Sequence, residues 1–495
     1  MKKYIVLILT VVLIIILGLS FIEYDNISAT NSILQQEITY GADDISQDFS
    51  EVSSLSSTDI NILCALTKGL VEKNSDGEII PSLASEFIKS EDGIQYEFKI
   101  RDDVFWSNGD KVTAKDVVTF FKELLKESCE DDIHCIMNIY GARAFKEGKV
   151  SFDNGVAVNC NDNNVVIRLN NRYDNFLEDL SKPQYRLRRN LVMWNNLIKN
   201  HSNLDYCGDY KIKEAYETNI LLEENNNYDK FKYINFIRDD SVEIAMAAYE
   251  INERDIVKDP PESELNKLKN ENNLITIPEN KATYMVINNS SISMYGRREI
   301  YKLVYKAVEE YYSKNTQEFE LAEGCYFREE KNNLTRVQQR KVDSSKEYDW
   351  SKPQVLTFIA RESKQNKILL RIIKEWFKNN TDITVKFTLA NEDEFNDSEL
   401  KNRYDVVIVN NEPFISDKEK FYLEFKEYIS DTDNDSFNKL KINNGNGDYC
   451  NLEDGLFYNY KILPLIFYNE NMAVSDKISE IVLDGNNNII FNKLN

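Results

Sequence analysis

The chain has 495 residues, enough for two or more domains, and 42% of them are apolar and 12% aromatic. This composition excludes a generally disordered chain, because it supplies enough apolar surface for folded cores. The 83 acidic residues outnumber the 60 basic ones and give a formal net charge of −23. Such a charge argues against nucleic acid as a partner, since phosphates require a basic surface.

The first feature along the chain is a nearly continuous apolar run from Tyr4 to Ile22, preceded by Met1-Lys2-Lys3. As a helix it would be about 29 Å long, enough to cross the hydrocarbon core of a bilayer. The two lysines would stay on the inner side, and Ser28-Ala29-Thr30 is a poor signal-peptide cleavage site. We therefore expect residues 1–23 to be an uncleaved membrane anchor, with a cleaved signal segment as the alternative, and residues 24–37 to be a tether.

Seven cysteines are scattered along the chain without Cys-x-x-Cys spacing. Their odd number leaves at least one thiol without an internal disulfide partner. Cys129 and Cys135 are close enough in sequence to form a bridge, although spacing alone does not show one. We expect mostly buried free thiols.

A strand, a turn and a helix follow one another in the first quarter of the chain. Tyr96, Phe98 and Ile100 alternate with polar residues, as in a half-buried strand. Gly109 then supplies turn chemistry, because glycine adopts positive φ without strain. Thr113 to Asp116 has the pattern of a capping box and opens an expected helix with one apolar face.

The second half of the chain has its own pattern of strands and helices. The segments Val355–Ala360, Ile383–Leu389 and Tyr404–Val409 have the composition of strands. Apolar residues recur at helical spacing from Ile368 to Phe377 and from Ile300 to Tyr311. Strands interleaved with helices indicate an α/β fold with a mainly parallel sheet covered by helices.

The sequence contains no evident catalytic arrangement. His134 and His201 are isolated from any paired metal-ligand spacing, so we expect a structural or surface role for each. Neither a Gly-x-Ser-x-Gly elbow nor a phosphate-binding loop occurs. We therefore expect a binding protein and not an enzyme, with no cofactor and no metal.

Short motifs in a consistent order run through most of the chain. They are Gly69–Val71, Pro81–Ala84, Glu91–Gly93, Phe105–Gly109, Thr113–Val117, Gly141–Gly148, Val165–Leu169, Gly208–Tyr210, Asn225–Tyr228, Asn252–Asp255, Tyr284–Asn288 and Ile462–Phe467. Together they resemble the extracytoplasmic solute-binding proteins of the oligopeptide, dipeptide and nickel class (family 5), which deliver ligand to ABC importers. Asp209 stands where that family has proline and Asn252 where it has glycine.

The resemblance implies a two-lobed periplasmic-binding-protein fold of type II, of the large cluster with an extra subdomain in the first lobe. We expect the first lobe at residues 38–245, including the subdomain at 59–150, and the second lobe at 246–470. Residues 471–495 would return to the first lobe. In this fold a ligand lies between the lobes, which close on it by hinge motion.

The resemblance also implies a monomeric receptor on the extracytoplasmic face of the membrane. Its partners would be short peptides and an ABC permease in the membrane. Strand-like hydrogen bonds would hold the peptide backbone, and a carboxylate of the second lobe would pair with the free amino group. The candidate ligand-binding residues are Gly41, Ala42 and Asp43 in the first lobe and Asn410, Asn411 and Glu412 in the second.

The second-lobe segment departs from the family pattern. After its strand the chain reads Asn410-Asn-Glu-Pro-Phe414, where the family more often has Gly-Trp and then Asp near Phe414. Glu412 is the nearest replacement for the amine-binding carboxylate, and residues 410–453 match the family poorly. Two alternatives therefore stay open: a peptide-signal receptor of the pheromone type, and a binder of nickel or another solute with the same fold.

Overall fold

The computed structural model describes the chain from residue 36 onward, apart from short internal gaps. The expected anchor (1–23) and most of the expected tether (24–37) lie outside the described residues. None of the helices that are described is long and apolar enough to cross a membrane. The described residues are 36–130, 132–225, 231–288, 292–314, 318–332, 340–342, 349–412, 418–428 and 449–495.

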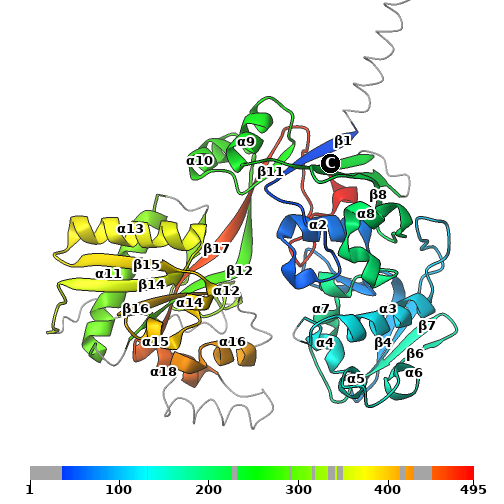
Figure 1. Ribbon diagram of the computed structural model, residues 1–495, viewed down its shortest axis with the longest axis horizontal. Coiled ribbons are helices and arrows are strands. Elements are labelled where there is room, and N and C mark those ends of the chain that lie inside the picture. The colour runs from blue at the N-terminus through cyan, green and yellow to red at the C-terminus, as the bar shows by residue number, and fades with distance from the viewer. Residues whose placement is uncertain are drawn as a thin grey trace, which may run out of the picture. The chain divides into compact units, whose positions relative to one another are not determined.

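The chain divides into two compact units. Unit 1 comprises Met1–Ile275 and Met472–Asn495, and unit 2 comprises Thr276–Asn471. Two long strands, β12 (Leu274–Ile287) and β17 (Ile462–Val474), lie side by side and carry the chain from one unit into the other (Figure 1).

The chain first passes from unit 1 into unit 2 after residue 275. The strand β11 belongs to unit 1 because it pairs in parallel with β1, the first strand of the unit. Asp255, just before β11, accepts hydrogen bonds from the backbone N and the Oγ1 of Thr39, both at 2.9 Å. Strand β1 covers Glu37–Ala42 and β11 covers Ile256–Lys258. The helices before and after β11 are α9 (Val242–Glu250) and α10 (Glu262–Asn270).

The main sheet of unit 1 is mixed. Strand β1 is parallel to β10 and β11, whereas β9 pairs antiparallel with β10 and β8. Helix α2 (Ser57–Leu66) packs against β8 and begins with a capping box between Ser56 and Asp59. The order of the sheet is β17, β11, β1, β10 (Tyr233–Arg238), β9 (Asn219–Glu224), β8 (Tyr210–Ala215).

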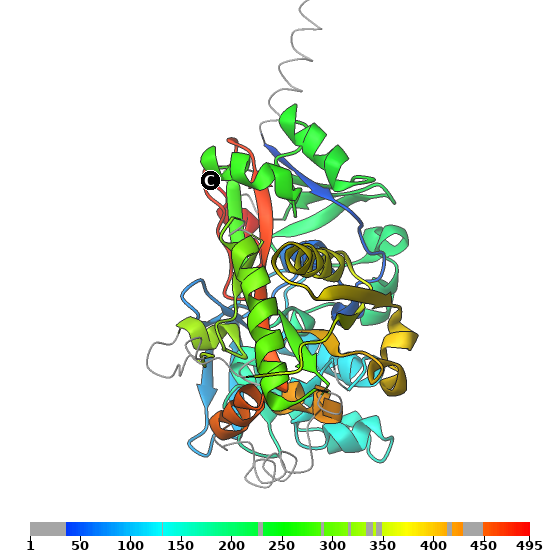
Figure 2. The same ribbon diagram turned by 90° about the vertical axis from the view of Figure 1, so that its left-hand side faces the viewer.

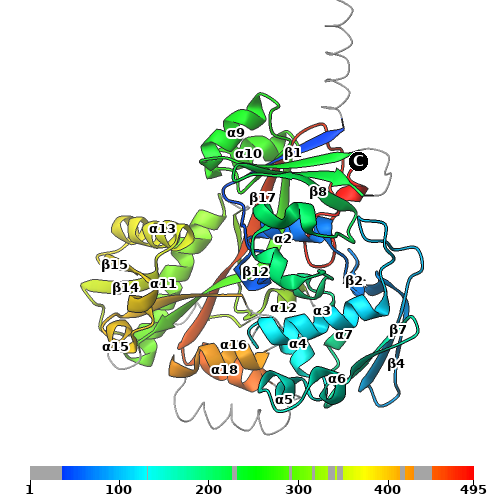
Figure 3. The same cartoon turned by 45° about the vertical axis from the view of Figure 1, so that its right-hand side comes forward.

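Unit 1 also contains a separate antiparallel sheet. Helix α3 (Ala114–Glu127) packs across it, against β6 and β7 (Figure 3). The order of this sheet is β4 (Ala84–Lys89), β5 (Gln95–Ile100), β7 (Asn164–Arg168), β6 (Val158–Asn161). Shorter elements around it are β2 (Val71–Lys73), β3 (Ile79–Pro81), α4 (His134–Met137), α5 (Ala142–Lys146), α6 (Phe152–Gly155), α7 (Phe176–Leu180) and α8 (Leu197–Asn200).

The predicted strand, turn and helix of this region are confirmed. The alternating residues Tyr96, Phe98 and Ile100 of β5 are buried, and Gly109 has a φ of 92°. Thr113 and Asp116 form the capping box of α3. The hydrophobic core around this sheet includes residues from Leu70 to Cys207.

Unit 2 is built on a second part of the sheet with helices packed on it. Strand β14 is parallel to β15 and β16, and β12 is antiparallel to β16. Helices α11 (Met294–Tyr312) and α13 (Lys364–Asn380) pack against each other, and α13 packs against β15 (Figure 2). The order of the strands is β15 (Thr384–Ala390), β14 (Val355–Arg361), β16 (Val406–Asn411), β12, β17, with β13 (Phe319–Leu321) pairing with β17. The shorter helices are α12 (Arg328–Asn332), α14 (Glu392–Phe395), α15 (Ser398–Lys401), α16 (Lys418–Glu424) and α18 (Cys450–Tyr458).

The strands and helices predicted for the second half of the chain are confirmed. The sheet is mixed, however, and not mainly parallel, because β12 runs antiparallel to β16. In unit 1, Asn252 has a φ of 62°. That conformation explains why the resemblance predicts glycine there and why asparagine is tolerated in its place.

All seven cysteines are free, so the expectation of free thiols is confirmed. The expectation that most of them are buried is wrong. Cys135, Cys207 and Cys325 are buried, Cys64 is intermediate, and the exposed ones are Cys129, Cys160 and Cys450.

Candidate ligand-binding site

The six predicted ligand-binding residues lie at the carboxyl ends of parallel strands. Residues 41–43 end and follow β1, which is parallel to β10 and β11 in unit 1. Residues 410–412 end and follow β16, which is parallel to β14 in unit 2. Ligands of open α/β sheets bind at this edge, where the chain leaves the strands. The structure therefore groups three candidates in each unit.

Gly41 lies against a buried ion pair. A Cβ on this residue would come within 2.8 Å of Asp239 Oδ2 and 3.5 Å of Arg254 Cδ. Arg254 donates to the Asp239 carboxylate through Nη2 at 2.8 Å and Nε at 3.1 Å. Glycine leaves room for this pair, because a Cβ at residue 41 would have to displace the end of the Asp239 side chain.

Ala42 and Asp43 differ in what they offer to a ligand. The Ala42 carbonyl accepts a hydrogen bond from the Asp239 backbone N–H at 2.8 Å. Asp43 is exposed, and no hydrogen bond or ion pair joins its side chain to another described residue. Asp43 is therefore the side chain of this segment that a ligand could reach.

Asn410 belongs to a chain of hydrogen bonds across three strands. Its Nδ2 donates to Thr283 Oγ1 at 2.9 Å, and Thr283 Oγ1 donates to Tyr468 OH at 3.1 Å. Burial raises the pKa of Tyr468 to about 12, although its bonds to Thr283 and Asn410 act in the opposite direction. The end of β16 thus presents neutral hydrogen-bonding groups in fixed positions.

Asn411 and Glu412 are held differently. Asn411 Nδ2 donates to Glu424 Oε2 of α16 at 2.5 Å. Glu412 is exposed, and its carboxylate makes no hydrogen bond or ion pair with any residue that the structure describes. The Glu412 carboxylate can therefore bind a cation without breaking an existing bond.

Thr283, Tyr468 and Glu424 are neighbours of the candidate residues that the sequence interpretation missed. They come from β12, β17 and α16, and Thr283 is separated from Asn410 by 127 positions. No local sequence pattern links residues that far apart, so only the register of the sheet brings them together.

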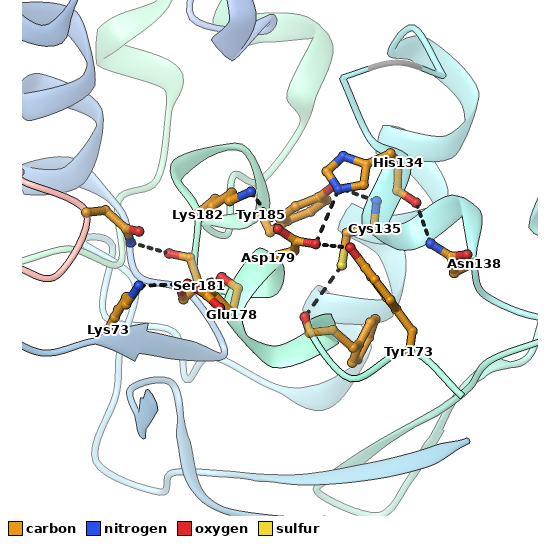
Figure 4. A network of polar contacts seen from close by, with 12 residues as sticks. Lys73, His134, Cys135, Asn138, Tyr173, Glu178, Asp179, Ser181, Lys182 and Tyr185 are labelled. Atoms are coloured by element: carbon orange, nitrogen blue, oxygen red, sulfur yellow. Dashed lines mark hydrogen bonds and ion pairs between the residues drawn. The ribbon is translucent and has the colours of Figure 1, made fainter. Parts of the chain in front are cut away.

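His134 lies in a polar network in unit 1 (Figure 4). Its Nε2 is 3.3 Å from Asp179 Oδ2, and Asp179 also accepts hydrogen bonds from Lys182 Nζ at 2.5 Å and from Tyr173 OH. Burial alone would raise the pKa of Asp179, but these three partners lower it to about 2. The network ties α4 to α7 and to the residues around α7.

The second histidine, His201, also bonds locally: its Nδ1 lies 2.8 Å from the Ile198 carbonyl. Within the described ranges, no cluster of histidine, cysteine, aspartate and glutamate is arranged to hold a metal ion. The groups available to a ligand at the two strand ends are thus carboxylates, amides and backbone.

Residues 78–302 match the family model described as "Bacterial extracellular solute-binding proteins, family 5 Middle". This segment covers most of unit 1 and the beginning of unit 2. It includes helix α3, the strand β12, which leads from unit 1 into unit 2, and the start of helix α11.

Two curated relatives from Bacillus subtilis (strain 168) align with parts of the chain. The oligopeptide-binding protein OppA is 33% identical over 171 residues, which are 33% of this chain and 31% of that protein. The dipeptide-binding protein DppE is 23% identical over 360 residues, which are 66% of this chain and 64% of that protein. The aligned segments thus span less than two thirds of either relative.

Among solved structures, the Escherichia coli murein tripeptide binding protein MppA matches with a TM-score of 0.64 at 18% identity, over 89% of this chain and 94% of that one. This likeness confirms the predicted fold class, α/β with the two-lobed periplasmic-binding-protein architecture. The family model over residues 78–302, the partial relatives and the shared fold show that the chain is similar to the family 5 bacterial extracellular solute-binding proteins.

Proposed function

We propose that this protein captures short peptides outside the cytoplasm and delivers them, as a monomer, to an ABC import permease. The observation that carries the proposal is its 33% identity to the oligopeptide-binding protein OppA over 171 residues. Binding, and not catalysis, is its role. The groups at the two strand ends are those that recognise a peptide backbone and its charged amino terminus.

The candidate residues divide this task. Glu412, exposed and without a partner among the described residues, pairs with the ammonium group of the peptide. Asn410, held by Thr283 at 2.9 Å, hydrogen-bonds the backbone without favouring any side chain. In unit 1, Asp43 offers a second exposed carboxylate, and Gly41 and Ala42 set the end of β1 on which it stands.

The N-terminal apolar run tethers the receptor to the outer face of the cell membrane. Support comes from the length of Tyr4–Ile22 and from the lysines that precede it. The intact mass of the protein extracted from membranes tests this part. A mass that includes residues 1–23 supports an anchor, and a mass that lacks them shows a cleaved signal.

Native mass spectrometry on the full chain, purified without denaturation, tests the peptide-binding proposal. We expect co-purifying peptides of varied sequence and a narrow range of length, because backbone contacts ignore side chains. A protein that is empty and also ignores an added mixture of di- to hexapeptides would contradict it. In that case nickel chelates and single pheromone peptides are the ligands to test.

A further inference from the structure

Unit 1 contains a pocket of about 330 Å³ that the proposed peptide site does not use. It lies between α3 and the segment 188–205, next to the turn that carries Trp106. Its charged lining comes from two arginines and three acids: Arg188, Arg189, Asp116, Glu123 and Asp205.

Arg189 is already engaged within the protein. It lies 2.8 Å from Asp205 Oδ2 and 3.3 Å from Asp116 Oδ1, and its guanidinium stacks 4.8 Å above the Trp106 ring. Arg189 also lies 3.5 Å from Asp110 Oδ2, so its charge is balanced within the protein and needs no ligand.

Arg188 is a buried cation without a carboxylate partner. Its side chain is 1% exposed, and its terminal nitrogens donate to the carbonyls of Phe49, Ser50 and Gln184. No described carboxylate forms an ion pair with it, and burial lowers the pKa of its guanidinium to about 9, with the more distant Asp48 acting in the opposite direction. A buried charge that lacks an opposite charge is costly, which favours a site for an anionic group.

Two N–H donors lining this pocket lack acceptors. In the part of the chain that the structure describes, neither Arg188 Nε nor Trp106 Nε1 has a hydrogen-bond partner, and Trp106 is 2% exposed. Buried donors are satisfied in most native proteins, and leaving one unpaired costs about 1–3 kcal/mol. A ligand with acceptor oxygens would supply the partners that these donors lack.

Glu123 supplies the opposite charge. One of its oxygens accepts from the Leu191 backbone N–H at 2.9 Å. No lysine or arginine of the described ranges makes an ion pair with Glu123. Lys126, one turn along α3, pairs with Glu127 at 2.6 Å instead. The pocket thus contains one cation and one anion that the protein leaves without an ionic partner.

We propose that this pocket binds a free α-amino acid, whose carboxylate accepts from Arg188 and Trp106 and whose ammonium pairs with Glu123. The volume of about 330 Å³ lies at the small end of the range for ligand pockets and has room for a single amino acid. This second site goes beyond the proposed peptide receptor, because it lies entirely within unit 1.

Equilibrium dialysis of the full chain against each of the twenty L-amino acids tests the proposal. At least one is expected to bind with one-to-one stoichiometry and to raise the midpoint of thermal unfolding. Its amide, which lacks the carboxylate, and its N-acetyl derivative, which lacks the ammonium, are expected to bind at least tenfold more weakly. Glu123→Gln is expected to lose at least tenfold in affinity, whereas Glu127→Gln, on the same helix but outside the pocket, is expected to bind normally.

The variants also separate this site from the peptide site. Arg188 holds three carbonyls and its substitution risks unfolding, so Trp106→Phe, which keeps the ring and removes the N–H, is the second variant. Glu412→Gln leaves amino-acid binding unchanged if the two sites are independent. No binding of any amino acid, or equal losses in Glu123→Gln and Glu127→Gln, would overturn the proposal, whatever the outcome with peptides.

Discussion

The Asp239 carboxylate lies so close to Gly41 that a Cβ on residue 41 would come within 2.8 Å of its Oδ2. The same oxygen accepts from Arg254 Nε at 3.1 Å, inside an ion pair whose side chains are 13% and 4% exposed. We expect Gly41→Ala to force the pair apart and to destabilise unit 1 by about 1–3 kcal/mol. Urea unfolding measures this, with Gly455→Ala as the control because its Cβ would meet open space. Equal effects of the two substitutions would show that residue 41 is not crowded.

Asp179 is expected to make the stability of unit 1 depend on pH at the acid end. Its partners hold its pKa at about 2 in the folded chain, whereas an aspartate in an unfolded chain titrates near ~3.9. The pKa of Asp179 is lower in the folded chain than in the unfolded chain. Its contribution to the free energy of unfolding is therefore complete above the unfolded pKa and is lost as the pH falls through about 4 towards 2. The difference corresponds to about 3 kcal/mol.

The variant Asp179→Asn tests this linkage. It is expected to lower the urea midpoint near neutral pH and to flatten the dependence of the midpoint on pH in the acid range. Asp153→Asn, whose side chain is 77% exposed, serves as the control for loss of a charge. A pH profile identical to that of the unmodified protein would remove Asp179 from the acid response.

Periodic and capped segments were predictable because their causes are local. The strand around Tyr96 and Phe98 and the capping box of α3 depend on residues within a few positions of one another. Contacts between distant residues were not predictable, and the hydrogen bond from Thr39 to Asp255, 216 positions away, is an example. The antiparallel β12 likewise has a pairing that no alternation of polar and apolar residues encodes.

The candidate site shows the same division. The resemblance and the end of a predicted strand led to Asn410 and Glu412. Neither pointed to Thr283, Tyr468 or Glu424, which reach Asn410 and Asn411 only through the pairing of strands and the placement of a helix. The pocket between α3 and the segment 188–205 could not be predicted from the sequence either, because Arg188 is far along the chain from Glu123 of α3.

Glu453 is the centre of a buried charged cluster in unit 2. It is 1% exposed and accepts from Arg340 Nη2 at 2.9 Å, Lys418 Nζ at 2.8 Å and Tyr422 OH at 2.8 Å. Burial alone would lower the pKa of Lys418, and the neighbouring carboxylates raise it instead. Glu453→Gln leaves two buried cations with weaker compensation, and we expect it to destabilise unit 2 by about 3 kcal/mol. Hydrogen exchange of unit 2 measures the loss, with the exposed Glu375→Gln on α13 as the control; equal exchange in both variants would contradict the prediction.

The cysteines give a direct test of burial. Burial raises the pKa of Cys207 to about 11 and that of Cys135 above its ordinary value. We expect a thiol reagent at mildly alkaline pH to label the native protein quickly at the exposed cysteines and slowly elsewhere, and to label all seven after denaturation without a reductant. Intact mass spectrometry counts the labels, and fewer than seven in the denatured protein would reveal a disulfide. The sites expected to react quickly are Cys129, Cys160 and Cys450.

Glu412→Gln is the substitution that tests the peptide site most directly. The carboxylate is exposed and has no partner among the described residues, so its replacement by an isosteric amide removes charge without breaking a bond of the free protein. If it pairs with the ammonium group of a peptide, affinity is expected to fall by about 1–3 kcal/mol, while the unfolding midpoint stays constant. Titration calorimetry with a peptide and with its N-acetylated form tests whether Glu412 binds the amino terminus. The acetylated peptide is expected to bind the unmodified protein and the variant equally weakly. Glu375→Gln controls for net charge in the same unit. An unchanged affinity in Glu412→Gln, with a loss in Glu424→Gln, would transfer the role to the carboxylate that Asn411 holds at 2.5 Å.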